Sequence, residues 1–350
     1  MTTCGPSFDA LSLCATPALN AATADRLRAA LAGVRDWDAL VADAEQHGIE
    51  TLLFAHAHEH ALALPSAVDA RLKTRFMQRA HATAVRARVI AGVLDAFEAD
   101  AVEALVLKGA ALAHLVYPAP VLRPMRDVDL LVAGRDADRA WQSLRRRGFA
   151  PFGIHPGREH HHLHALAITL DGQTIVVEIH KQALAAAPFT RPLRYEDVAP
   201  RAQPFWCGRP AQTLGREDML WHVYAHAFLV SVLRPDTRLI SIADLVAGVE
   251  AWVEVLDWDR LRRTCPRLVR ALPLIGDLVP WSSRVQQRLD RPRLRSSARP
   301  GTAGWWLDVR YGSDGTPRRI WNSLVTRPVS VALDATHLAR AKLRAPGRTS

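Results

Sequence analysis

The sequence has no long apolar run and few cysteines, and both absences narrow the class of protein. No apolar stretch approaches the roughly 18 residues that a membrane-spanning helix needs. The N-terminus carries Asp9 and lacks a basic segment followed by an apolar one, so we expect no signal peptide and a cytoplasmic protein. The four cysteines, Cys4, Cys14, Cys207 and Cys265, are scattered without C-x-x-C spacing. Neither a zinc site nor a disulfide framework is indicated.

Acidic residues are fewer than basic ones, and most of the imbalance lies at the C-terminus. The chain carries 45 Lys and Arg against 35 Asp and Glu, and from Asp290 to Ser350 twelve Lys and Arg face only four Asp. Trp305, Trp306 and Trp321 are interleaved with this charge, a pattern that could serve nucleic acid or an acidic surface. No nucleic-acid-binding motif accompanies it. We therefore expect a partly ordered extension whose tryptophans pack back on the body, and nucleic acid is not the favoured partner.

An acidic pair inside an apolar run is the most informative feature that is present. Asp127 and Asp129 are separated by Val128 in a Val- and Leu-rich segment that predicts a buried strand. Side chains alternate between the faces of a strand, so both carboxylates point the same way. They repel each other and are costly to bury, unless a divalent cation compensates their charge. Oxygen ligands of this kind suit Mg²⁺ bound together with substrate phosphates. A metal-free acidic pair at a strand edge is the alternative.

Two neighbouring segments strengthen the metal–nucleotide interpretation. Upstream, the predicted strand 105–107 stops at Lys108 and Gly109 and a small-residue helix follows, so backbone N–H groups and the lysine could contact a phosphate. Downstream, the apolar segment 174–180 predicts a strand that carries one acid, Glu178. A third carboxylate from a neighbouring strand is what a two-metal phosphoryl-transfer centre needs.

The order of these segments resembles the nucleotidyltransferase superfamily that includes DNA polymerase beta and the aminoglycoside nucleotidyltransferases. More narrowly, it is similar to the bacterial uncharacterised nucleotidyltransferase family, whose pattern is K-G, then R-x-x-x-D-I-D-L-L-V, then V-D-L-H. The matching residues here are Lys108-Gly109, Arg123-x-x-x-Asp127-Val-Asp129-Leu-Leu-Val132 and Val177-Glu178-Ile179-His180. The resemblance extends loosely over residues 35–265, including a helical histidine region at 222–226 and Asp244. Two departures stand out: Ala110 replaces the serine that follows the glycine in the wider superfamily, and the gap from Gly109 to Asp127 is long for it.

The resemblance implies transfer of a nucleoside monophosphate from an NTP, first of all ATP, to an acceptor hydroxyl. Asp127 and Asp129 would hold Mg²⁺ or Mn²⁺, and Glu178 would complete the metal site or accept the acceptor's proton. Lys108 and the backbone of Gly109 would contact phosphate. The acceptor is not readable from the sequence, and a small molecule, a peptide and a saccharide stay open. A catalytically inactive relative that binds nucleotide or a partner is the rival hypothesis, since the hydroxyl is missing at Ala110.

Basic residues and histidines near these segments are further candidates for nucleotide binding. Arg123 and Arg126 flank the acidic pair as phosphate ligands or as structural counter-ions, and Arg123 matches the family arginine. His180 shares the face of Glu178 and is the best functional candidate among the histidines. His226 lies one helical turn after His222 and is equally compatible with a nucleotide contact and with a core position. His160, His161, His162 and His164 are expected to form a surface cluster beside the cleft rather than a zinc site.

The hydrophobic pattern divides the chain into four predicted regions, and the fold class is expected to be α+β. Residues 1–100 form a helical region, broken near Gly48 and at 64–66, where Ser66 is predicted to cap a helix over 67–97. Residues 101–215 form a small mixed-sheet α/β core of the nucleotidyltransferase type. A helical domain over 216–285 and the basic extension over 286–350 follow.

Overall fold

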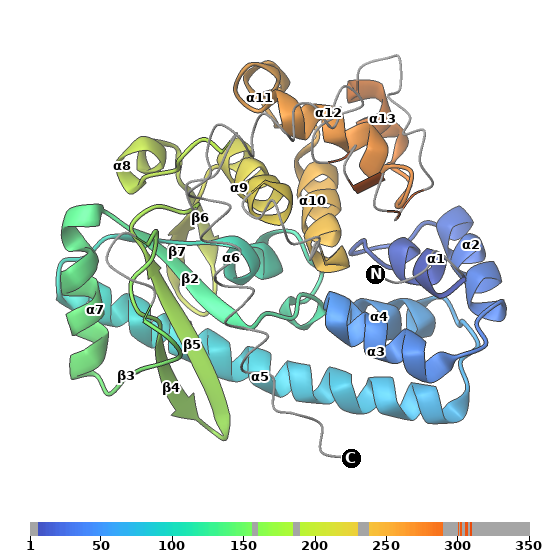
Figure 1. Ribbon diagram of the computed structural model, residues 1–350, viewed down its shortest axis with the longest axis horizontal. Coiled ribbons are helices and arrows are strands. Elements are labelled where there is room, and N and C mark those ends of the chain that lie inside the picture. The colour runs from blue at the N-terminus through green and yellow to red at the C-terminus, as the bar shows by residue number, and fades with distance from the viewer. Residues whose placement is uncertain are drawn as a thin grey trace.

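The computed structural model describes residues 6–155, 160–184, 190–229 and 238–289, together with Pro300, Thr302, Trp305, Trp306 and Val309. The predicted Trp321 and most of the basic extension lie outside these residues. The first part is helical: α1 (Pro6–Leu13), α2 (Ala21–Ala32), α3 (Trp37–His47), α4 (Glu50–Glu59) and α5 (Ser66–Ala99). Figure 1 shows α5 as one long helix that runs past both the other N-terminal helices and the sheet.

Helix boundaries in this region follow local chemistry. Gly48 ends α3 in the left-handed conformation (φ 71°), as expected for a glycine after a helix, and α4 begins at Glu50. The prediction that Ser66 caps α5 is wrong. The helix already includes Ser66, and Pro65, whose ring fixes φ near −56°, precedes it without a side-chain cap. In the part of the chain that the structure describes, no helix is both long and apolar enough to cross a membrane.

A seven-stranded sheet occupies the centre, and all of its strands fall inside the predicted α/β region. They are β1 (Ala104–Val106), β2 (Asp127–Val132), β3 (Ala150–Pro151), β4 (Leu166–Leu170), β5 (Gln173–His180), β6 (Gln203–Trp206) and β7 (Pro210–Thr213). Their order is β3-β4-β5-β2-β1-β7-β6. β2 pairs with β5, and β1 with β7, in parallel, whereas the remaining pairs are antiparallel. The sheet is therefore mixed, as predicted.

Short helices connect the strands and pack against them. α6 (Lys108–Leu115) contacts β2, and α7 (Ala137–Arg146) and α5 contact β5. The remaining connections hold three 3₁₀ turns (Pro120–Leu122, Gly134–Asp136 and Ala199–Arg201) and the short α8 (Tyr195–Val198). The β4–β5 hairpin turns at Asp171 and Gly172, both with positive φ, which is the backbone that a two-residue hairpin favours.

In Figure 1 the C-terminal helices lie above the sheet region, on the side away from α5. They are α9 (Arg216–Phe228), α10 (Leu239–Trp252), α11 (Trp258–Thr264), α12 (Pro266–Ile275) and α13 (Ser283–Arg288). Trp305 is fully buried, Trp306 stacks on Phe228, and Tyr224 donates to the carbonyl of Val309. For these two tryptophans the prediction that the extension packs back on the body is confirmed.

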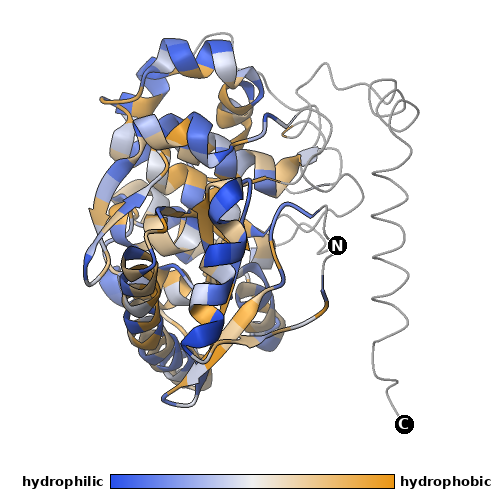
Figure 2. Cartoon of the chain, turned by 90° about the vertical axis from the view of Figure 1, so that its left-hand side faces the viewer, coloured by the Kyte–Doolittle hydropathy of each residue, from blue (hydrophilic) through white to orange (hydrophobic). Residues whose placement is uncertain are grey.

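One continuous hydrophobic core joins the helical regions to the sheet. It extends from Phe8 in α1 through Val128 and Leu130 in β2 to Trp305. Figure 2 colours the chain by hydropathy and shows orange on much of the sheet and alternating blue and orange along the outer helices. The observed α+β architecture, a mixed sheet between N-terminal and C-terminal helices, confirms the predicted fold class.

Candidate active site

The acidic side chains of β2 and β5 meet on one face of the sheet. In the parallel pairing of these strands, Asp129 lies directly opposite Glu178, and Leu131 lies opposite His180. Asp127 is one pleat before Asp129 and points to the same face, while Val128 and Leu130 point to the other and are fully buried. Ligand atoms of Asp129, Glu178 and His180 all lie within 4.8 Å of one another. The structure thus brings the third predicted acid next to the pair, on the adjacent strand.

Asp129 is the most completely surrounded of the three carboxylates. Its side chain is 7% exposed, Lys108 Nζ lies 3.1 Å from Oδ2, and His180 Nε2 lies 2.8 Å from Oδ1. Burial by itself opposes ionisation, but Lys108 and His180 outweigh it and hold the pKa of Asp129 well below its usual range. Although burial and the charge of Lys108 act to lower it, the pKa of His180 is raised by its contacts with Asp129 and Glu178. Asp129 is therefore an ionised, charge-matched group.

Asp127 is in the opposite situation. No hydrogen bond or ion pair of its side chain occurs among the described residues, and it is half-buried. Burial and the neighbouring charge of Asp129 raise the pKa of Asp127, although Lys108 acts against them. Glu178 lies between these extremes: although burial acts to raise it, its pKa is lowered by the hydrogen bond from His180 together with the charges of His162 and His180. Of the three carboxylates, Asp127 is therefore the one without a direct partner among the described residues.

The Lys108 turn places a cation at the start of α6 in a strained backbone. Lys108 has φ 42°, a region that side chains with a Cβ rarely adopt, and such strain clusters at functional sites. Gly109 follows, and a Cβ there would lie 2.7 Å from Nη1 of Arg123. Arg123 is held in place, so any larger residue at 109 would clash with it. The close approach that the sequence assigned to a phosphate is made in this structure by Arg123, and the phosphate contact of Gly109 stays a prediction.

The guanidinium group of Arg123 forms hydrogen bonds with a buried carboxylate and with a backbone carbonyl. Its Nε and Nη2 donate to Asp244 at 2.9 and 2.6 Å, and its Nη1 donates to the carbonyl of Pro124. Tyr117 donates to the same Asp244 at 2.8 Å. Although burial alone would lower it, the pKa of Arg123 is raised because of Asp244. Arg123 thus joins the segment before β2 to α10, which matches the counter-ion alternative; a direct phosphate contact stays a prediction.

Arg126 and Arg238 are the two cations near Asp127 that are best placed to bind a phosphate. Arg126 is exposed beside Asp127, with no side-chain partner among the described residues. Burial, together with the nearby Arg126 and Arg123, lowers the pKa of Arg238, and Asp127 partly restores it. Two like charges gathered beside a carboxylate favour an anionic ligand. Arg238 was assigned no role from the sequence, and only the Arg-Leu pair two turns before Asp244 could have indicated it.

A buried arginine of α5 was also missed. Arg86 donates from Nη2 to the carbonyl of Met125 at 2.9 Å, two residues before Asp127. Burial lowers the pKa of Arg86 to about 10, although Asp127 acts against this. The residue supports the entry to β2 from a helix that lies far away in the sequence, so nothing in the local pattern around 86 could have shown it.

Histidines surround the carboxylates on two sides. The segment of His161 and His162 pairs with the end of β5, both rings lie 5.3 Å from the ring of His180, and His162 Nε2 lies 3.8 Å from Glu178. His164 instead contacts the carbonyl of Gly153. His161 and His162 therefore lie beside the acidic residues, and the ring of His160 lies 4.2 Å from each of theirs; a role of the cluster in the site stays a prediction.

On the other side, α9 places His222 and His226 near Lys108. The charge of Lys108, followed by burial, lowers the pKa of His226 to about 3. His222 is fully buried, and neither of its ring nitrogens has a hydrogen-bond partner among the described residues. Burial and the charge of Lys108 also lower the pKa of His222, so both histidines of α9 lie within the electrostatic field of the Lys108–Asp129 pair. Whether His226 contacts nucleotide stays a prediction.

These features define a nucleotidyltransferase-like site: a mixed sheet, a glycine turn before a helix, and three carboxylates on adjacent strands. The chain belongs to the uncharacterised nucleotidyltransferase family, which it matches over residues 34–275. The match covers the N-terminal helices from α3 onward, the whole sheet, and the C-terminal helices to α12. The family assigns the chain to the transferases of phosphorus-containing groups. No curated protein and no solved structure matches it.

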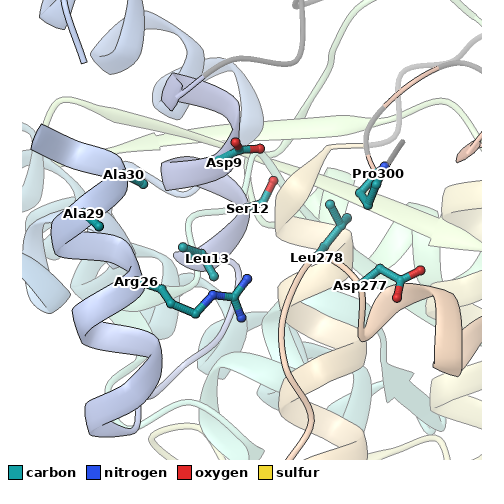
Figure 3. Close-up of a pocket in the computed structure, with 9 residues that line it drawn as sticks. All are labelled: Asp9, Ser12, Leu13, Arg26, Ala29, Ala30, Asp277, Leu278 and Pro300. Carbon is teal, nitrogen blue, oxygen red and sulfur yellow. The ribbon is translucent and has the colours of Figure 1, made fainter. Parts of the chain in front are cut away.

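A separate cavity of about 400 Å³ lies between α1, α2 and the turn after α12 (Figure 3). Its walls combine Asp9, Ser12, Leu13, Arg26, Ala29, Ala30, Asp277, Leu278 and Pro300. None of these residues comes from the sheet, α6 or α9. The cavity is therefore distinct from the carboxylate site.

Proposed function

We propose that this protein is a Mg²⁺-dependent nucleotidyltransferase that moves a nucleoside monophosphate from an NTP, first of all ATP, to a hydroxyl group of an acceptor. The supporting observation is the placement of Asp127, Asp129 and Glu178 on one face of two adjacent parallel strands, beside the strained Lys108 turn. The family assignment supports the same reaction class.

The donor set fits a divalent metal ion. Asp127 has no side-chain partner among the described residues, and Glu178 is half-buried with one oxygen near His180 and His162. Three carboxylates offer the oxygen ligands that Mg²⁺ prefers, and the raised pKa of Asp127 marks negative charge without a counter-ion. Asp127, Asp129 and Glu178 would hold the metal, which supplies charge neutralisation for the triphosphate and for the developing charge on the α-phosphate.

The chain's own residues account for the remaining requirements of the transfer. The acceptor oxygen attacks the α-phosphorus, the bond from that phosphorus to the bridging β-oxygen breaks, and pyrophosphate leaves with the bonding electrons. The proton of the acceptor hydroxyl passes to a carboxylate, for which Glu178 is the candidate. Lys108, Arg126 and Arg238 would balance the charge of the triphosphate, and His180 keeps Asp129 ionised and oriented.

The proposal is tested by binding and turnover measured on the same protein. Titration calorimetry with ATP should show binding in Mg²⁺ or Mn²⁺ that is lost in excess chelator, because the carboxylates repel a bare triphosphate. Asp127→Asn should lose this binding, whereas Asp259→Asn, on the exposed side of α11, should retain it. Equal affinity of the wild type with and without chelator contradicts the metal-dependent site.

Turnover measurements distinguish an active enzyme from the alternative, an inactive nucleotide-binding relative. Pyrophosphate release is followed with each NTP in the presence of pooled candidate acceptors: small alcohols, saccharides and hydroxyl-bearing peptides. Release that requires both Mg²⁺ and an acceptor supports transfer. Mg²⁺-dependent binding with no release from any pool supports the inactive relative, for which Ala110, in place of a hydroxyl-bearing residue, is the one favourable observation.

A further inference from the structure

A second group of metal-ligating side chains lies at the end of α4, away from the sheet. His56, Glu59 and His60 are spaced i, i+3 and i+4, so they share one face of the last helical turn. One ring nitrogen of each histidine and a carboxylate oxygen of Glu59 lie within 4.8 Å of one another. None of these residues contacts the carboxylates of β2 and β5, and the catalytic proposal does not use them.

The hydrogen bonding of His56 fixes which nitrogen is available. Its Nε2 lies 2.9 Å from the carbonyl oxygen of Thr16, in the connection between α1 and α2. A carbonyl can only accept, so Nε2 carries the proton, which leaves Nδ1 of the neutral imidazole with a lone pair for a ligand. This Nδ1 is buried without a hydrogen-bond partner, in a side chain that is 1% exposed. A histidine whose second nitrogen donates to a backbone carbonyl is the usual arrangement of a metal ligand.

His60 and Glu59 complete the group from the solvent side. The Nε2 of His60 is also buried and has no partner, while Glu59 is exposed and can turn its carboxylate toward both rings. A neighbouring cation, Arg28, donates to the backbone carbonyl of His60 and forms an ion pair with Asp25. Two orphaned ring nitrogens beside one carboxylate are better explained by a shared ligand than by packing alone.

We propose that His56, Glu59 and His60 bind a single Zn²⁺ ion, with water as the fourth ligand. Two imidazole nitrogens and one carboxylate oxygen are a donor set of zinc, whereas Mg²⁺ prefers oxygen ligands alone. The His56 ring, which the carbonyl of Thr16 orients, connects the ion at the end of α4 to the α1–α2 connection. The site stabilises the N-terminal helices and does not depend on the proposed transferase activity.

The test uses the full chain, freed of metal by a chelator and kept in millimolar Mg²⁺. Zinc is titrated against a chromophoric chelator, and Co²⁺ is used separately as a spectroscopic probe. We expect one tight equivalent, with the d–d absorption of a four-coordinate Co²⁺ site. His60→Gln and Glu59→Gln should each weaken it at least tenfold. His58→Gln is the matched control, because His58 lies on the same turn but contacts Asp69.

Two further variants exclude zinc bound elsewhere. Asp129→Asn in the carboxylate site and His161→Gln in the His160–His162 cluster should both retain the tight equivalent. Loss of that equivalent in either variant, or its survival in His60→Gln, overturns the proposal. Melting curves control for folding: zinc should raise the Tm of the wild type and of His58→Gln, and leave that of His60→Gln unchanged. An equal rise in all three would also overturn it.

Discussion

Two buried aspartates of this protein, Asp244 and Asp129, show how a structural carboxylate differs from one in a binding site. Both are almost fully buried, at 2% and 6% exposure. Asp244 accepts two hydrogen bonds from Arg123 and one from Tyr117, and no other acid among the described residues forms a hydrogen bond or ion pair with these two side chains. Asp129 is held by Lys108 and His180, but His180 also lies 3.5 Å from Glu178, and the charge of Lys108 also acts on Asp127, which has no direct partner among the described residues.

The difference lies in charge balance, not in burial. Around Asp244 one negative charge meets one guanidinium with matched geometry, so the group is complete without a ligand. On the β2–β5 face, Lys108 and His180 contact Asp129 and His180 also contacts Glu178, so among the described residues Asp127 is left without a direct ion pair. Buried charge without a partner is costly, and a protein that maintains it has a use for a cation that arrives with the substrate. Changes at the two aspartates should therefore have effects of different kinds.

The largest effect is expected at Asp244. Asp244→Ala leaves the guanidinium of Arg123 and the hydroxyl of Tyr117 buried without an acceptor, so the free energy of unfolding should fall by about 3–5 kcal/mol. Urea denaturation followed by circular dichroism measures this loss. The same loss should appear with and without Mg²⁺–ATP.

The control for this prediction removes both charges. Arg123→Met combined with Asp244→Leu should be less destabilising than Asp244→Ala alone, because no buried charge is left unpaired. If the double variant is as unstable as the sum of the single ones, the Arg123–Asp244 pair does not act as a closed unit and the contrast with Asp129 fails.

Asp127→Asn should have the opposite signature. The folded state raises the pKa of Asp127, so its ionised form lowers stability at pH 7, and the amide should leave the Tm unchanged or higher. Loss of a metal-binding carboxylate should nevertheless reduce pyrophosphate release by two to three powers of ten, equivalent to about 3–4 kcal/mol of transition-state stabilisation. A large fall in Tm would show that Asp127 supports the fold as Asp244 does.

Lys108→Ala tests whether Lys108 acts as a structural counter-ion of Asp129, as a ligand of the substrate phosphates, or as both. Lys108 pairs with Asp129 at 3.1 Å, so the ligand-free variant should lose some stability, and Mg²⁺ should restore part of it by taking over the charge balance. Binding of Mg²⁺–ATP should weaken by about 1–3 kcal/mol, the scale of a charge-assisted contact. Melting curves with and without Mg²⁺ and ATP measure both, with the exposed Lys73→Ala as control. Stability loss with undiminished ATP binding contradicts the phosphate role of Lys108.

The sequence predicted the strands that carry the site better than the contacts that hold the surrounding side chains. Strand alternation was enough to place Asp127 and Asp129 on one face, and the apolar run around Glu178 was enough to predict the neighbouring strand. These features depend on a few consecutive residues. The bonds of Arg123 to Asp244 and of Arg86 to Met125 join positions 121 and 39 residues apart, so local spacing could not reveal them.

The zinc candidate on α4 shows the same limit. The spacing of His56, Glu59 and His60 is visible in the sequence, but it becomes informative only when the Thr16 carbonyl fixes the tautomer of His56. Ser66 shows a smaller limit, because a serine after proline fits both the cap and the first helical position, and only the backbone of Pro65 decides between them.

The smallest expected effect concerns the helix that carries Asp244. The backbone N–H of Leu239, the first residue of α10, donates to Nδ1 of His47 at 3.3 Å, which requires that nitrogen to be unprotonated. Burial is the main cause that lowers the pKa of His47 below 6.5. A lowered pKa gives stability that is complete above the unfolded value and is lost as pH falls through 6.5, because the unfolded state then binds the proton first. His47 should contribute at most about 1.4 kcal/mol per pH unit to this loss.

His47→Gln, whose amide oxygen can accept the same bond without titrating, should lose less stability between pH 7.5 and pH 5 than the wild type, as urea denaturation at the two pH values would show. Other buried histidines contribute equally to both proteins, and His81→Gln, at an exposed position, should behave like the wild type. Identical pH dependence of His47→Gln and the wild type would mean that this bond does not fix α10, and that Asp244 is held in place by Arg123 and Tyr117 alone.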